Sequence, residues 1–156
     1  MRNWFFLLIV FTFTITQVTI VNYFRVFGVK PDLILISVVF AAISLDFKWA
    51  VSLSIFAGIL KDAFSFGPFS ISVISFPLCS LFIARISKEI PTDNNVVRAI
   101  IIFVSVVFNN ILTRLIFLCS GKYVPASVFL RVTFIESLYT AFTAFIILKI
   151  YQIRIK

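Results

Sequence analysis

The sequence predicts an all-α, polytopic membrane protein built as a bundle of six transmembrane helices. Of its 156 residues, 62% are hydrophobic and only 13% are charged, whereas a soluble domain is about half apolar and a quarter charged. The apolar residues also form long runs, and a helix needs roughly 20 residues to span a bilayer. Five or six spans use up the whole length, so we expect one integral membrane domain over residues 1–156.

The apolar runs define the first three helices. Residues 4–21 lack a small-residue cleavage site, which predicts an uncleaved first span. Pro31 and Asp32 precede the run 33–45, and both are typical of a helix start because Pro fits the first turn and Asp complements the helix dipole. A polar turn at 46–48 leads to residues 49–60. Both runs are short for a bilayer, so we expect a hairpin of two thin spans or a re-entrant pair.

The second half of the chain predicts three more helices. Residues 69–84 form the fourth, which we expect Pro77 to kink. Residues 85–98 are the longest polar stretch and predict a loop. Residues 99–118 and 126–150 then form a final hairpin around a turn at 120–125.

The distribution of Lys and Arg predicts the orientation, because cytoplasmic ends of spans carry more of them. With the N-terminus inside, one end of the bundle holds eight cationic residues and the other holds four. The eight are Arg2, Lys48, Arg85, Lys88, Arg98, Lys149, Arg154 and Lys156, and the four are Arg25, Lys30, Lys61 and Lys122. We therefore expect both termini in the cytoplasm and the protein in the inner membrane. The cations are scattered singly, which argues against nucleic acid as a partner.

Composition also argues against an enzyme. The chain has no His, and Cys79 and Cys119 are far apart in sequence, so neither an imidazole base nor a CxxC motif exists. Ser and Thr are plentiful but lack the usual activating base. We expect no cofactor and no metal, and we interpret the two cysteines as small apolar side chains.

One stripe of small residues ends at a carboxylate. Ala50, Ser54, Gly58 and Asp62 recur every fourth residue and share one helix face. Small residues at this spacing allow a second helix to approach closely. Gly67 and Pro68 then break the helix. Two interpretations remain: the stripe serves packing alone, or Asp62 contacts a partner or ligand.

A second polar cluster is predicted in the last hairpin. Its register places Asn109 opposite Glu136 and Arg114 opposite Arg131, with Glu136 near mid-membrane. A charge there is costly unless it faces protein. We expect Glu136 to bond Asn109 or Asn110 and to be neutralised by an arginine one turn away, or to be protonated. The cluster is a structural buttress, a lipid or ligand site using both arginines, or an ion path through Glu136.

Residues 30–70 carry a resemblance to a known family. "KPDLILISVVF", then "GILKDAF" and "SFGPFS", resemble the rod shape-determining protein MreD of bacteria. The matching positions are Pro31, Asp32, Gly58, Asp62, Gly67 and Pro68. Ser70 stands where the family has a Gly, and Asp46-Phe47-Lys48 replaces a turn that is often basic with Gly.

The resemblance implies a non-enzymatic inner-membrane scaffold of the elongasome, which builds the lateral cell wall. Implied partners are MreC, directly, and MreB, RodA and a penicillin-binding transpeptidase, directly or indirectly, besides membrane lipid. The family is also similar in fold to substrate-binding subunits of energy-coupling-factor vitamin transporters. That transport function is the alternative, and it predicts a closed ligand pocket on the outer side of the bundle.

Overall fold

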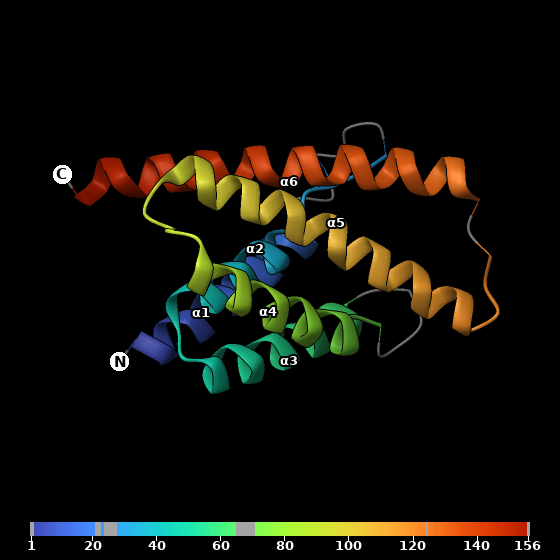
Figure 1. The fold of residues 1–156 in the computed structure, drawn as a ribbon, viewed down its shortest axis with the longest axis horizontal. Coiled ribbons are helices and arrows are strands. Elements are labelled where there is room, and N and C mark those ends of the chain that lie inside the picture. The colour runs from blue at the N-terminus through green and yellow to red at the C-terminus, as the bar shows by residue number, and fades with distance from the viewer. Residues whose placement is uncertain (1, 21–22, 24–27, 65–70, 124, 156) are drawn as a thin grey trace.

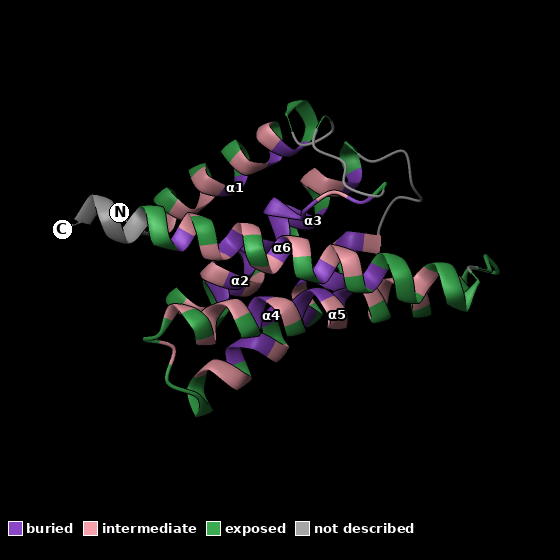
Figure 2. Cartoon of the chain, turned by 90° about the horizontal axis from the view of Figure 1, so that it is seen from above, coloured by how far each residue is buried: buried purple, intermediate pink, exposed green. Residues whose placement is uncertain are grey.

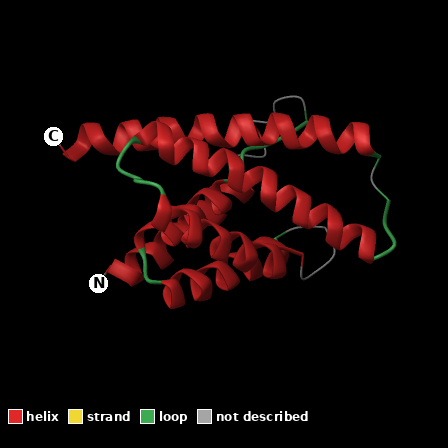
Figure 3. Ribbon diagram, in the orientation of Figure 1, coloured by secondary structure: helices red, strands yellow, loops and turns green. Residues whose placement is uncertain are grey.

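The residues that the structure describes form six helices (Figures 1 and 3). The computed structural model describes residues 2–20, 23, 28–64, 71–123 and 125–155. The helices are α1 (Arg2–Thr19), α2 (Leu33–Ser44), α3 (Phe47–Ala63), α4 (Ile71–Glu89), α5 (Asn95–Cys119) and α6 (Ala126–Ile155). For these described residues, the prediction of an all-helical fold with six helices is confirmed.

Helix α2 lies at the centre of the bundle. It packs against each of the other five helices, and nine of its 12 residues are buried. Its sequence LILISVVFAAIS is apolar on every face, which is typical of a helix that is surrounded by protein. At 12 residues it is about 18 Å long, which is less than a hydrocarbon core of about 30 Å.

Helices α3 and α4 are the most closely packed pair of helices among the described residues. Their backbones touch at Gly58, where an added Cβ would lie only 2.6 Å from the carbonyl oxygen of Ser72. Helix α4 runs through Pro77 as one helix from Ile71 to Glu89. The absence of a Cβ at Gly58 therefore allows α3 and α4 to approach this closely.

The predicted loop at 85–98 is wrong in its extent. Helix α4 continues to Glu89, and α5 begins at Asn95 after Asn94, whose side-chain oxygen accepts a hydrogen bond from the Val96 amide at 3.1 Å. The connection is therefore only residues 90–94. Charged residues such as Arg85 and Lys88 are good helix formers, so a helix can continue past the apolar run that predicts it.

Helices α5 and α6 form a long hairpin at one side of the bundle. In the described part of the chain, α6 contacts only α5 and α2. The two helices diverge toward the connection at 120–125, and this end projects beyond α3 and α4 (Figure 1). Exposed residues gather on the same end of α6 (Figure 2). The hairpin is thus held to the rest of the protein mainly at its middle and at its other end.

Three of the described helices are long and apolar enough to cross a membrane: residues 71–89, 95–119 and 126–150. Helices α1 and α2 are apolar but shorter. Large apolar side chains are exposed around the bundle, among them Trp4, Leu8, Leu130 and Phe142, as lipid solvation requires. We conclude that the chain is an integral membrane protein. The start of α1 and the end of α6 lie at the same end of the bundle (Figures 1 and 2), while six full spans and cytoplasmic termini stay predictions.

Candidate functional site

The start of α2 is a junction of four helices. Pro31 and Asp32 are both buried. The carboxylate of Asp32 caps α2 by accepting a hydrogen bond from the Leu35 amide at 3.1 Å, which satisfies a helix N–H that has no partner of its own. The backbone N–H of Asp32 donates to the hydroxyl of Thr140 on α6 at 3.2 Å. The predicted helix start therefore also anchors the last helix.

Lys61, from the end of α3, forms an ion pair with Asp32. The Asp32 side chain is 3% exposed and that of Lys61 is 26% exposed, so the pair is largely withdrawn from solvent. The ammonium group also lies 4.8 Å from the centre of the Phe76 ring on α4, a favourable cation–π distance. Lys61 thus joins α3 to both α2 and α4.

Gln17 of α1 completes this network through both ends of its amide. Its nitrogen donates to Asp32 at 3.4 Å and its oxygen accepts from the Ile34 amide at 3.0 Å. The second bond satisfies another free N–H in the first turn of α2. The side chains of Gln17, Asp32, Lys61 and Thr140, which we call the junction network, therefore connect four helices around one carboxylate.

Asp62 and the small-residue stripe lie against α4 of the same chain. Ala50, Ser54, Gly58 and Asp62 are all buried. The carboxylate of Asp62 accepts hydrogen bonds from the amide of Ser72 at 3.0 and 3.2 Å, one to each oxygen, and from that of Val73 at 3.2 Å.

These hydrogen bonds cap the first turn of α4 from outside the helix. The helix that approaches the stripe is thus α4 itself. Gly67 and Pro68 fall outside the described residues.

The polar cluster between α5 and α6 differs in detail from the predicted one. The amide nitrogen of Asn110, not that of Asn109, donates to Glu136 at 2.9 Å. Arg114 lies 4.5 Å from the centre of the Phe129 ring, and Arg131 is exposed. Asn109 is buried, and its side-chain oxygen has no hydrogen-bond partner in the described chain.

The expected arginine partner of Glu136 is not found. Among the described residues no ion pair joins Glu136 to an arginine. The physical reason is that α6 faces α2 as well as α5, so the hairpin register alone does not select the neighbour.

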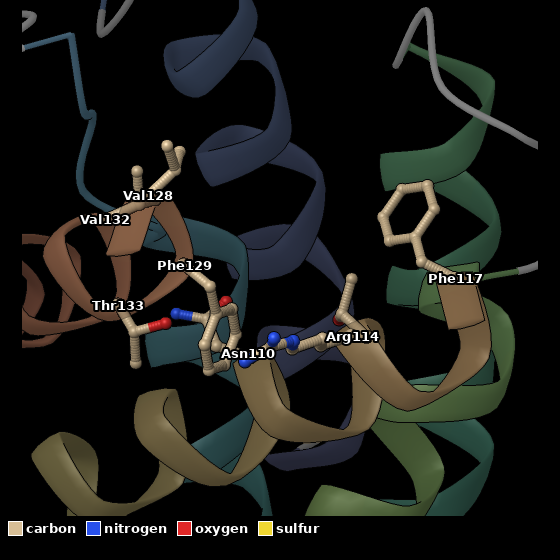
Figure 4. A pocket seen from close by; sticks show the side chains of 8 residues that line it. Asn110, Arg114, Phe117, Val128, Phe129, Val132 and Thr133 are labelled. Carbon is tan, nitrogen blue, oxygen red and sulfur yellow. The ribbon is translucent and has the colours of Figure 1, made fainter. Parts of the chain in front are cut away.

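A shallow pocket lies where α5 and α6 begin to diverge. It has a volume of about 150 Å³ and is lined by Asn110, Arg114, Phe129 and Thr133, with Phe117 and two valines farther out. Figure 4 shows the Arg114 side chain along the Phe129 ring, pointing toward Asn110. Its Nε atom has no hydrogen-bond partner in the described chain. Ligand pockets usually have 300–1,000 Å³, so this one is small.

The chemistry available in these two clusters is limited to hydrogen bonding and charge pairing. Among the described residues no group of three His, Cys, Asp or Glu side chains is placed to hold a metal ion. Cys79 is buried, whereas Cys119 is exposed at the end of α5.

The junction network contains residues that the sequence interpretation overlooked. Neither Gln17 nor Thr140 was singled out as a site residue. Lys61 was counted only among the cations that predict the orientation, yet a signal for its partner existed. The connection between α2 and α3 is residues 45 and 46, and that antiparallel register places position 61 opposite position 30, two residues before Asp32.

A family model described as rod shape-determining protein MreD matches residues 1–154 of the chain. Comparisons with curated proteins and with solved structures gave no match.

Proposed function

Since the chain belongs to the MreD family of rod shape-determining proteins, we propose that it acts as a scaffold subunit of the bacterial cell-elongation machinery. In this proposal it is a non-enzymatic protein of the inner membrane. It binds MreC and thereby helps to position the peptidoglycan synthases RodA and a penicillin-binding transpeptidase near MreB. The family match over nearly the whole chain is the observation that carries this proposal.

The use of polar groups inside the bundle supports a scaffold. The carboxylates of Asp32 and Asp62 are fully engaged in capping helices and in an ion pair. Because these polar groups are used within the bundle, partner proteins would bind mainly to its outer surfaces. The stripe that includes Gly58 is covered by α4, so we place the partner contact on an exposed face instead.

We place MreC at the projecting end of the α5–α6 hairpin. Large apolar side chains are exposed there on both sides of the connection: Leu115, Leu118, Tyr123, Val128 and Leu130, at 45–77%. This end is the predicted outer one, where a single-span partner with an outer domain would lie. An apolar end that extends beyond the other helices is more accessible to a protein partner than a face in the middle of the bundle.

Co-purification with MreC tests this placement. The double substitution Leu118→Ser and Leu130→Ser should reduce capture of MreC from detergent-solubilised membranes without altering the amount of folded protein. Leu8→Ser is the matched control, because Leu8 on α1 is 63% exposed and Leu130 is 65% exposed. Unchanged capture by the double variant, or an equal loss with the control, would refute the placement.

The transporter alternative receives less support from the geometry. It requires a closed pocket at the predicted outer end, and the pocket near Arg114 has only about 150 Å³. We therefore retain the scaffold as the proposed function.

A further inference from the structure

A larger pocket lies at the opposite end of the bundle, where both chain termini are. It has a volume of about 350 Å³ and lies between α1 and α6, which do not contact each other directly in the described chain. Helix α2 forms its floor through Ser37, Phe40 and Ser44. Apolar side chains dominate its lining, including Phe6, Phe13 and Ile147. Such a space suits a flexible hydrocarbon chain, because its aromatic walls exclude water.

Arg98 is the only charged residue in the lining of this pocket. Its Nε donates to the backbone oxygen of Thr92 at 2.6 Å, which orients the guanidinium group. No carboxylate in the described chain pairs with it. The remaining donors at the end of the guanidinium are therefore left for an anion.

The depth of Arg98 matches that of a lipid phosphate. Helix α5 has 25 residues and is about 37 Å long, so it exceeds a hydrocarbon core of about 30 Å by a few ångströms at each end. Arg98 lies three residues after the first residue of α5, close to the boundary of the core. A phosphate held there would let an acyl chain descend along Phe6 and Phe40.

Exposed cations surround this end of the bundle. Lys48 is the second residue of α3, Lys88 is the last residue but one of α4, and Lys149 follows Leu148 of the pocket lining. Together they favour a lipid with a net negative charge over a zwitterionic one, because each cation near an anionic surface contributes about 1 kcal/mol.

We propose that this pocket binds one anionic phospholipid, with its phosphate at Arg98 and one acyl chain between α1 and α6. The phospholipid would fill the space that separates the two helices and fix α6 relative to α1. This site is independent of the protein partners proposed above, because it lies at the other end of the bundle.

Native mass spectrometry of the purified protein tests the proposal. The protein is equilibrated with phosphatidylglycerol and phosphatidylethanolamine that carry the same acyl chains, and bound lipid is counted. We expect one retained molecule with a preference for phosphatidylglycerol. Arg98→Gln should lower that preference roughly fivefold, the factor that corresponds to one lost cation, and Arg98→Lys should keep most of it.

Two further variants distinguish binding of a lipid in the pocket from general attraction of lipids to surface cations. Arg85→Gln removes an exposed arginine of α4 that does not line the pocket, so it should leave the preference unchanged. Ser44→Phe should reduce retention of both lipids by filling the pocket. The proposal is overturned if the wild type shows no preference, if Arg85→Gln matches Arg98→Gln, or if Ser44→Phe retains lipid normally. It is also overturned if a photoreactive side chain at Ile9 cross-links to protein and not to lipid in native membranes.

Discussion

Replacement of Gly58 by alanine provides the sharpest test of how the helices pack. A Cβ at this position would lie 2.6 Å from the oxygen and 2.8 Å from the carbon of the Ser72 carbonyl, and 2.8 Å from the Cα of Val73. All three are backbone atoms, so no side chain can rotate away. Ordinary contacts begin at 3.4 Å, which means that α3 and α4 must separate by roughly 1 Å to accommodate the methyl group.

The expected cost follows from this separation. Overpacking of a well-packed interior costs about 1–3 kcal/mol. The higher helix propensity of alanine offsets up to about 1 kcal/mol of this loss in the free energy of unfolding. The Asp62 hydrogen bonds to the amides of Ser72 and Val73 lie within one turn of the contact, so they lengthen as the helices move apart. We expect a net loss of about 1–2 kcal/mol in the free energy of unfolding.

Equilibrium unfolding in mixed detergent micelles measures this loss. Ser52→Ala is the matched control, because Ser52 is an exposed residue of α3 that does not face α4 and changes mainly helix propensity. The double variant Gly58→Ala with Asp62→Asn should lose less than the sum of the two single losses, since both act on the same contact. A Gly58→Ala protein as stable as the wild type would refute the close approach of the two helices.

Three further predictions concern the charged residues that bond within the bundle. Lys61→Met should destabilise the protein by about 3 kcal/mol, because it leaves the carboxylate of Asp32 unpaired, and the additional change Asp32→Asn should restore part of the loss in the same unfolding assay. Asp62→Asn should cost about 1–2 kcal/mol by weakening the cap of α4, and an unchanged unfolding midpoint would contradict that role. Glu136→Gln should change stability by less than about 1 kcal/mol and leave cell shape normal in a complementation assay, because a glutamine oxygen still accepts from Asn110. A loss of rod shape with the Glu136→Gln protein correctly folded would instead favour an ion path.

The sequence predicts the helices well because their apolar runs depend on local chemistry. The ends are less well predicted where charged residues extend a helix, as at Arg85 and Lys88, which continue α4 to Glu89. Helix propensity does not distinguish a charged residue in a final helical turn from one in a loop. The cap at Asn94 provides a better indication of where α5 starts.

The site residues were predicted in part. The start of α2 at Asp32 is a local feature, since the carboxylate caps its own helix. The contacts of Lys61 with Asp32 and of Thr140 with the Asp32 amide join residues 29 and 108 positions apart. Glu136 was expected to bond Asn109 or Asn110, and the structure selects Asn110. One residue along a helix rotates the side chain by about 100°. A register counted from the turn is not accurate to one residue, so it does not show which of two neighbouring residues faces Glu136.

By itself, the sequence determined that this protein is helical and resides in lipid, because apolar composition and run length decide how a chain is solvated. It also determined the family, through residues that lie close together along the chain. Only the tertiary structure decided that the small-residue stripe at Gly58 receives α4 and that Lys61 pairs with Asp32. Both contacts depend on which helix faces pack against each other. These helices are apolar on almost every face, so the sequence does not show which face meets which neighbour.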